Sequence, residues 1–444
     1  MTSFSQSPLR SRCANTGQLS VAEKSWRATP CRPTRRLLPF LLLAAASLSA
    51  GELPPARLVE SSLLIRTGFD SDPTAMNSTT APTPGSEDVI YYAAGLSASV
   101  TFSGAVPAKR SLMLGYTGEI DRFDNCPSED FAAHRLAWNG QISEGTWKFS
   151  GEGSTLFVAG SRDTLPSVSS VNANAITLWR ERRRQWQNRL KLQAQTNRDK
   201  YLVRATGTLL AYDYQTRAVS GNVPFADRYD AQAAVEVGWR QSANSTWLTG
   251  VRAGHQDQAI VPLPNCEFDY SNDYQRLVVG WEGKPSSNTT AAFAAGPDFH
   301  HYTGAIDSRV FTGGRDRTSL WFEGSFSAKP CSTLTLTGKT ARWVWLSSTG
   351  KSAYVDTNAE TAAAWTITPT LTLRFTAKIH RCDYFPAVRD DWESLLGTGA
   401  TLKFSSRSVL TLDYLHHVGW NGIGNVAGRE FQRNVVNLGA TITL

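Results

Sequence analysis

The sequence lacks any apolar run long enough for a transmembrane helix, although 41% of its 444 residues are hydrophobic. Such a helix needs about 20 consecutive apolar residues, and the longest apolar stretch, LLPFLLLAAASLSA at residues 37–50, is shorter. Arginines precede this stretch and small residues end it, as in a secretory signal peptide. We therefore predict that residues 1–50 are a signal peptide, cleaved near Ala50. Its basic start is unusually long, which leaves the true translation start open.

Cysteine is scarce, and its spacing excludes the common zinc motifs. Of six cysteines, only Cys126, Cys266, Cys331 and Cys382 lie after the predicted cleavage site, and they are far apart. Because no CxxC or Cys/His cluster has the spacing of metal ligands, we predict no metal site and no other cofactor. In an oxidising cell envelope one or two disulfides are compatible with this number, with the pairing left open.

Excess charge of one sign is also missing from the mature chain. The formal net charge is +7, but seven basic residues and one acidic residue lie before residue 51, so removal of that segment leaves +1. A balanced chain has no basic surface of the kind that attracts nucleic acid. We therefore predict no nucleic-acid partner.

Catalytic motifs are absent as well. Neither GxSxG nor HExxH occurs. The histidine pairs at 300–301 and 416–417 are adjacent, and neighbouring residues of a strand point to opposite faces. The sequence therefore predicts that the protein is not an enzyme.

The dominant pattern in the sequence is an alternation of polar and apolar residues. In TLTLRFTAKIHRCDYF, residues 370–385, the even positions up to His380 are polar and the odd positions between them are apolar. A period of two residues is typical of a β-strand with one wet and one apolar face. About eighteen such segments follow one another between residues 63 and 444. We predict an all-β fold over 63–444, preceded by a short periplasmic segment at 51–62.

The connections alternate in length along the chain. Short turns such as SEG, NRDK and QSAN alternate with longer polar links, among them residues 70–87, 215–228, 259–272 and 347–359. This rhythm is typical of an antiparallel up-and-down transmembrane β-barrel with short periplasmic turns and longer outer loops. A soluble sandwich or solenoid is the alternative, and it would show neither the rhythm nor such long alternation.

Aromatic residues cluster beside the short turns, on the apolar phase of the strands. Aromatic belts mark the membrane interfaces of barrels. The predicted girdle consists of Trp147, Tyr201, Trp239, Trp247, Trp281, Phe326 and Phe404.

Over residues 63–444 the chain resembles bacterial outer-membrane β-barrel proteins. More narrowly, Gly68, Phe69, Asp70 and Asp72 in LLIRTGFDSDPT resemble the first strand of a group of porin-like β-barrels, some of which accompany exopolysaccharide systems. Leu444 stands where such barrels often end in an aromatic residue. The resemblance implies the outer membrane of a Gram-negative-type bacterium, with lipid, periplasmic chaperones and the barrel assembly machinery as partners, and it leaves homo-oligomers open.

A barrel of about 18 strands is wide enough for an aqueous channel. The polar phase of the strands carries thirteen basic residues and seven acidic residues, an excess of six positive charges. The basic residues that we predict to face the lumen and to set its selectivity are Arg183, Arg189, Lys191, Arg204, Arg252, Arg276, Arg374 and Lys378. We predict a porin-like channel for passive passage of small hydrophilic solutes, with a preference for anions. Two alternatives stay open: the charges pair across strands and stiffen the wall, or the barrel has a structural or export role linked to exopolysaccharide secretion.

Overall fold

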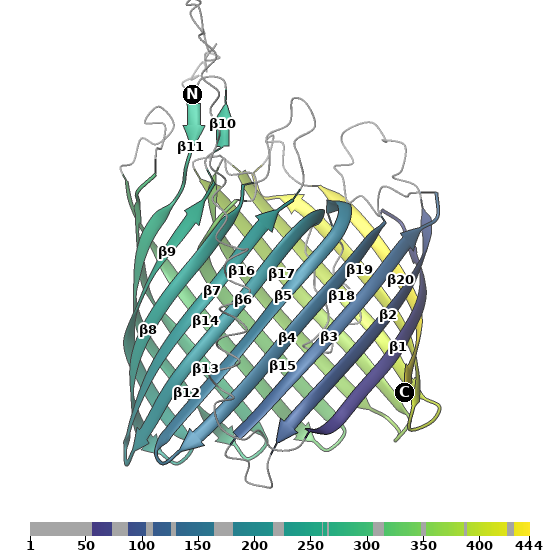
Figure 1. The fold of residues 1–444 in the computed structure, drawn as a ribbon, viewed down its shortest axis with the longest axis horizontal. Helices are drawn as coiled ribbons and strands as arrows, with labels where there is room; N and C mark the ends of the chain where they lie inside the picture. Colours follow the sequence, from purple (N-terminus) through teal and green to yellow (C-terminus); the bar gives the residue numbers. More distant parts are fainter. Residues whose placement is uncertain are drawn as a thin grey trace, which may run out of the picture. The chain divides into compact units, whose positions relative to one another are not determined.

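Eighteen long antiparallel strands form one closed sheet in the computed structural model (Figure 1). The structure describes residues 56–72, 88–103, 110–125, 130–163, 181–215, 226–259, 261–263, 266–304, 315–347, 352–385, 389–423 and 430–444. Within these residues no helix is long and apolar enough to cross a membrane. The predicted signal peptide, residues 1–50, lies outside the described residues.

The barrel strands are 13 to 18 residues long. They are β1 (Ala56–Asp70), β2 (Val89–Ser103), β3 (Arg110–Phe123), β4 (Phe131–Glu144), β5 (Trp147–Asp163), β6 (Glu181–Arg198), β7 (Tyr201–Tyr214), β8 (Arg228–Ser242), β9 (Ser245–Gln258), β12 (Asn272–Ser286), β13 (Thr289–Tyr302), β14 (Asp316–Cys331), β15 (Leu334–Leu346), β16 (Ala353–Thr366), β17 (Leu371–Phe385), β18 (Arg389–Lys403), β19 (Ser408–Asn421) and β20 (Phe431–Thr443). The short strands β10 (Val261–Leu263) and β11 (Cys266–Phe268) pair only with each other, in the connection between β9 and β12.

Pairing between the first and last strands closes the sheet. β1 pairs with β2 along its whole length and with β20 from Ser62↔Thr443 to Asp70↔Val435. Every other barrel strand pairs with its neighbours along the chain. A closed sheet satisfies its backbone hydrogen bonds without a free edge, which is the condition for strands to cross a bilayer. This confirms the predicted all-β, up-and-down barrel.

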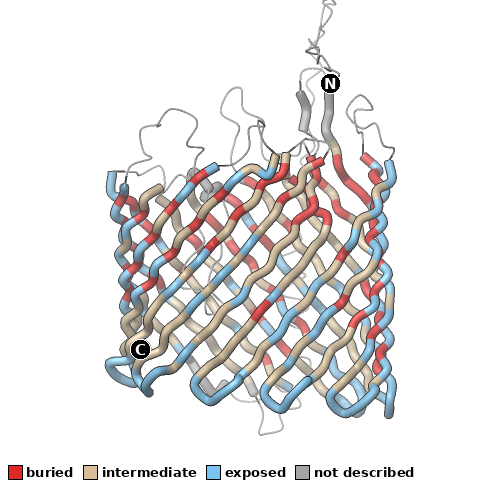
Figure 2. The backbone as a smooth tube through the Cα atoms, turned by 180° about the vertical axis from the view of Figure 1, so that it is seen from behind, coloured by how far each residue is buried: buried red, intermediate tan, exposed pale blue. Residues whose placement is uncertain are grey.

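Inside and outside are reversed relative to a soluble protein. In β8 the side chains of Val235 and Val237 are 51% and 45% exposed, whereas Glu236 between them is 5% exposed. Figure 2 shows this alternation of buried and exposed positions along many strands. Apolar residues on the outside and polar residues on the inside match a surrounding lipid phase and a wet lumen. The fold is therefore that of a transmembrane β-barrel of the outer-membrane type.

Turns of two residues join strands at one end of the barrel. They lie at 145–146, 199–200, 243–244, 287–288 and 332–333, and the C-terminus lies at the same end (Figure 1). Gly145 adopts a φ of 58°, a conformation that glycine reaches without steric cost. We call this the short-turn end and the opposite end the outer rim.

Two boundaries differ from the sequence-based expectation. Residues 56–62, expected in a periplasmic segment, belong to β1 and pair with β2. Glu60, Ser61 and Ser62 put polar residues on both phases, which hid the alternation. Similarly, the link expected at 347–359 ends before Ala353, because β16 starts there. Strand pairing, which the sequence does not show, overrides the local pattern at both places.

Two of the four cysteines after residue 50 have described side chains. Cys331 is exposed and Cys382 is buried, and neither forms a disulfide. Cys126 and the side chain of Cys266 lie outside the described residues.

Candidate functional site

A cavity of about 1920 Å³ occupies the interior of the barrel. Its lining reaches from residues near the short-turn end, such as Glu60 and Thr443, to residues near the outer rim, such as Ser347 and Tyr384. Strands from all around the barrel contribute to the lining. The cavity therefore runs along most of the strand length inside the described part of the chain.

Seven of the eight basic residues selected from the sequence line this cavity. They are Arg189, Lys191, Arg204, Arg252, Arg276, Arg374 and Lys378. Arg183 lies in β6, but its side chain is outside the described part of the structure. The alternation of β-strands explains the placement, because each residue occupies the inward phase of its strand.

The charge of the lining is more balanced than expected. Among the described residues, nine arginines and lysines and seven aspartates and glutamates line the cavity, which leaves two positive charges rather than six. Asp356 was not among the acidic residues predicted to face the lumen, because residues 347–359 look like a loop in the sequence. Arg66 was counted among the thirteen basic residues of the polar phase. In the structure it is 7% exposed and binds Glu119 and Asp121 in the wall. The corrected excess argues against a uniformly basic lumen.

Arg204 and Arg252 belong to a ladder of ion pairs. Arg204 Nη2 lies 2.8 Å from Glu282, and its Nη1 lies 3.3 Å from Glu236. Arg252 Nη2 lies 2.8 Å from Glu236 and 2.9 Å from Glu323. The ladder therefore crosses strands β12, β7, β8, β9 and β14. Because three carboxylates surround two guanidinium groups, this part of the wall carries no free positive charge.

Arg276 and Arg374 are paired as well. Arg276 lies 3.0 Å from Asp298, and both side chains are almost fully buried. Arg374 lies 2.5 Å from Asp413. The alternative that lumen charges pair across the wall therefore holds for four of the selected residues, including the two in the ladder.

Trp321 packs against the same arginines. It is 3% exposed, and the guanidinium carbon of Arg252 lies 4.4 Å from its ring centroid. Arg276 lies 5.8 Å from that centroid. Such contacts hold a guanidinium over an aromatic face, so this tryptophan supports the wall rather than standing free in the lumen.

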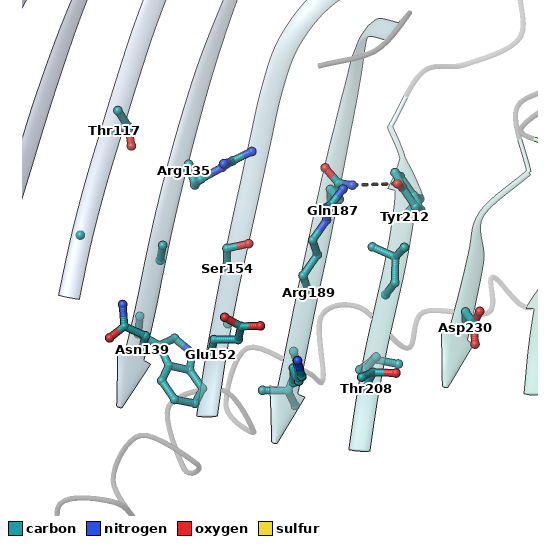
Figure 3. Close-up of a pocket in the computed structure, with 18 of the residues that line it drawn as sticks. Thr117, Arg135, Asn139, Glu152, Ser154, Gln187, Arg189, Thr208, Tyr212 and Asp230 are labelled. Atoms are coloured by element: carbon teal, nitrogen blue, oxygen red, sulfur yellow. Dashed lines mark hydrogen bonds between the residues drawn. The ribbon is translucent and has the colours of Figure 1, made fainter. Parts of the chain in front are cut away.

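Three cations on strands before the ladder form no ion pair with a described residue: Arg135, Arg189 and Lys191. We call them the cationic wall. Arg135 comes from β4 and Arg189 from β6 (Figure 3). Lys191 also lies in β6. Arg135 and Arg189 lie close enough to interact electrostatically. Two like charges that face a wet cavity without a carboxylate partner attract a negatively charged solute.

Uncharged polar groups border the cationic wall. The side-chain amide of Gln187 donates a 2.8 Å hydrogen bond to the hydroxyl of Tyr212 (Figure 3). Ser154 lies directly opposite Arg189 in the β5–β6 register, and Glu152 lies opposite Lys191 without an ion pair between them. These groups can donate and accept hydrogen bonds to a polar solute beside the positive charges.

Four residues of the aromatic girdle form one row. Tyr201, Trp239, Trp247 and Trp281 lie directly opposite one another on β7, β8, β9 and β12. The indole N–H groups of Trp247 and Trp281 donate to Gln241 and Ser245. Of the whole predicted set, six side chains are at least 41% exposed, namely Trp147, Tyr201, Trp239, Trp247, Phe326 and Phe404.

The histidine pairs considered for catalysis do not meet. His300 faces inward with its side chain fully buried and lies 2.9 Å from Asp298, whereas His301 is 58% exposed and lies 2.6 Å from Asp316. His416 Nδ1 lies 2.9 Å from Asn434, and His417 lies 3.2 Å from Glu393. Each histidine thus has a different partner in the wall.

Comparison with known proteins finds likeness only among solved structures. No protein-family model matches the sequence, and no curated protein matches it. Similar structures include OpdO of Pseudomonas aeruginosa, with 12% identity over 87% of this chain and 97% of that chain and a TM-score of 0.42. OpdK of the same species, crystallised with vanillate, has 12% identity over 87% and 98% of the two chains and a TM-score of 0.42. A BenF-like porin of Pseudomonas fluorescens Pf-5 has 11% identity over 87% and 99% and a TM-score of 0.43. At these values the likeness carries no argument about solute or mechanism.

Proposed function

We propose that this chain is a porin-like channel of the outer membrane for small hydrophilic solutes, with a preference for carboxylates and other small anions. One observation carries the proposal: a cavity lined by many polar and charged side chains extends from the short-turn end to the outer rim of an 18-stranded barrel. Barrels of this size enclose space that side chains do not fill. A wet path between the two ends is what diffusion requires.

The preference for anions rests on the cationic wall. Arg135, Arg189 and Lys191 have no ion-paired carboxylate among the described residues, whereas the arginines of the ladder are neutralised. The attraction is therefore local, on one side of the lumen. A carboxylate passing this side gains charge-assisted hydrogen bonds that a neutral solute of the same size does not.

Solute uptake by proteoliposomes tests the proposal. Swelling rates are compared for gluconate, glucitol and glucosamine, which have similar size and different charge. We expect all three to enter and gluconate to enter fastest. The double variant R189Q/K191Q should remove the advantage of gluconate while glucitol entry stays unchanged. Lys284→Gln is the matched control, because it removes a positive charge outside the cavity lining.

A folded barrel that admits none of the three solutes would contradict the channel. It would favour the other role inferred from the sequence, a structural or export barrel that accompanies exopolysaccharide secretion. Equal entry of gluconate and glucitol would retain the channel and remove the anion preference.

We further propose that residues 1–50 direct export and are removed. Mass spectrometry of the N-terminus of the membrane-extracted protein tests this directly. Assembly by periplasmic chaperones and the barrel assembly machinery, and association into homo-oligomers, remain predictions.

A further inference from the structure

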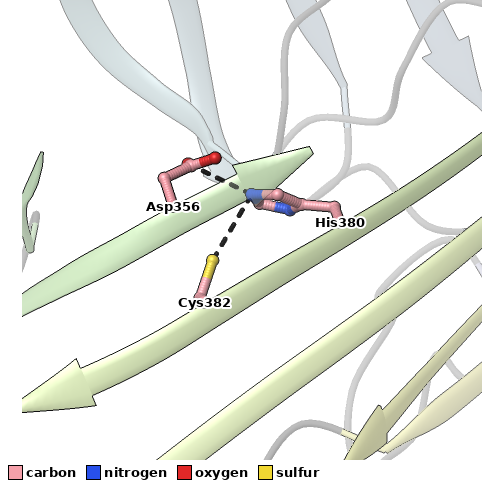
Figure 4. A group of neighbouring side chains, drawn as sticks. All are labelled: Asp356, His380 and Cys382. Carbon is pink, nitrogen blue, oxygen red and sulfur yellow. Dashed lines mark hydrogen bonds and ion pairs between the residues drawn. The ribbon is translucent and has the colours of Figure 1, made fainter. Parts of the chain in front are cut away.

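Three side chains with different metal-binding chemistry meet on the lumen wall near the outer rim. Asp356 of β16 lies directly opposite Cys382 of β17 in the strand register. His380 precedes Cys382 by two residues and therefore points to the same face. Figure 4 shows the three side chains pointing toward one another. All three line the cavity, so an ion in the lumen can reach them.

The ligand atoms are already close to the spacing of a metal site. His380 Nε2 lies 3.1 Å from Asp356 Oδ2 and 3.5 Å from Cys382 Sγ, and all three ligand atoms lie within 4.8 Å of one another. With zinc bond lengths of about 2.0–2.3 Å and tetrahedral angles, ligand atoms stand about 3.3–3.6 Å apart. Binding therefore requires only small side-chain movements.

The carboxylate is also held in the required orientation. Asn358 Nδ2 donates a 3.1 Å hydrogen bond to Asp356 Oδ1, which leaves Oδ2 directed at the histidine. Partners of this kind fix the ligands of metal sites and contribute to affinity. Cys382 forms no disulfide, and its side chain is 4% exposed, so the thiol is shielded from most of the lumen.

We propose that Asp356, His380 and Cys382 form a site for a divalent transition-metal ion, best suited to zinc. One thiolate, one imidazole and one carboxylate match the ligands that zinc takes, whereas calcium and magnesium require more oxygen ligands. Three protein ligands leave a fourth position, which faces the cavity. Water or an anion from the lumen would occupy it.

The local charge sets the strength of the site. The Asp356 carboxylate and a Cys382 thiolate together balance a divalent ion. Lys378 lies two residues before His380 on the same strand and interacts electrostatically with Asp356 and Cys382. Its positive charge opposes a bound cation, so Lys378→Gln should strengthen binding.

The sequence predicted no metal site, because its cysteines and histidines lack the familiar linear spacing. A search for linear motifs misses this site, because two ligands are two residues apart on one strand and the third comes from the neighbouring strand. It is independent of whether the barrel conducts solutes. Only the strand register is required.

Cobalt binding to the purified full barrel under reducing conditions tests the proposal. Thiolate ligation of Co²⁺ produces a charge-transfer absorption, and zinc should displace the cobalt at one equivalent per chain. Cys382→Ser should abolish the absorption. It should also weaken zinc binding by more than about tenfold, since even partners outside the ligand shell contribute roughly 10- to 100-fold.

Cys331→Ser is the matched control, because Cys331 is exposed at the opposite end of the barrel. It should bind cobalt like the wild type. His380→Gln provides a second ligand variant, and strand content by circular dichroism confirms that each variant is folded. Cobalt absorption that persists in folded Cys382→Ser, or that disappears in Cys331→Ser, would overturn the site. So would a folded wild type that binds neither metal.

Discussion

Arg433 of β20 forms a two-pronged ion pair with Asp70 of β1, which lies 363 residues earlier in the chain. Nε of Arg433 lies 2.7 Å from Oδ1 of Asp70, and the side chains are 1% and 0% exposed. The pair lies at the seam where the last strand meets the first. Asp70 also belongs to the stretch that resembles porin-like first strands, and this contact gives it a structural role in closing the barrel.

Removal of one partner of this pair should weaken the barrel. Asp70→Asn leaves the Arg433 guanidinium buried without its counter-charge, and the expected loss is about 3–5 kcal/mol in the free energy of unfolding. Urea titration of the barrel in liposomes measures the loss. Arg122→Gln is the control, because the Arg122–Asp130 pair spans 3.6 Å with 59% of the arginine exposed, and such pairs contribute less than about 1 kcal/mol. Similar small losses in both variants would contradict the role of the seam.

Adjacent positions on β7 should respond differently to a charge. Ala205 is exposed on the outside of the barrel, whereas Thr206 lines the cavity. Arginine on the lipid face near the membrane centre costs roughly 2–4 kcal/mol. Ala205→Arg should therefore destabilise the barrel by about this amount, and Thr206→Arg should have a mild effect. The comparison uses the same unfolding titration, and a reversed order would mean that the assigned faces are wrong.

Neutralising the cationic wall should change ion selectivity. In R189Q/K191Q two of the three positive charges of the cationic wall are gone, so the reversal potential across a salt gradient should move toward the value for a cation-preferring pore. Lys284→Gln should leave it unchanged. If the double variant and the control behave alike, selectivity does not come from this wall.

Stability should depend on pH through Asp227 at the outer rim. Burial raises the pKa of Asp227 from its ordinary value of 3.8 to about 6, although the backbone N–H of Tyr214 donates a hydrogen bond that opposes the shift. The folded protein then binds this proton more tightly than the unfolded chain, so stability falls as pH rises from about 4 to about 6.

Asp227→Asn removes this titration and keeps an oxygen that can accept the Tyr214 hydrogen bond. The melting temperature of the variant minus that of the wild type should therefore increase between pH 4 and pH 7. A constant difference over this range would show that Asp227 does not titrate as described.

The strands could be predicted from the sequence because the membrane imposes the pattern directly. In β17, Phe375 and Ile379 are 45% and 43% exposed on the outside, whereas Arg374 and Lys378 line the cavity. Lipid on one side and water on the other enforce a period of two over the whole strand. Where polar residues occupy both phases, as at Glu60 and Ser61, the pattern fails, and only pairing with β2 reveals the strand.

The pairing of the charges could not be predicted in the same way. Arg204 and Glu282 are 78 residues apart and lie on strands that are not neighbours, so their 2.8 Å contact depends on the tilt and register of several strands. The net charge of the lumen could not be predicted either. The phase of the single strands gave an excess of six positive charges, whereas the described cavity lining has an excess of two. The Asp356–His380–Cys382 cluster likewise depends on the register of β16 with β17.

The central claim is that the barrel is an open, anion-preferring pore, and planar-bilayer conductance across a salt gradient tests it most directly. The purified, refolded mature chain is inserted, and single-channel current is recorded against voltage. We predict stable ohmic steps with a reversal potential on the anion-selective side. A correctly folded barrel that inserts and carries no current would contradict the claim.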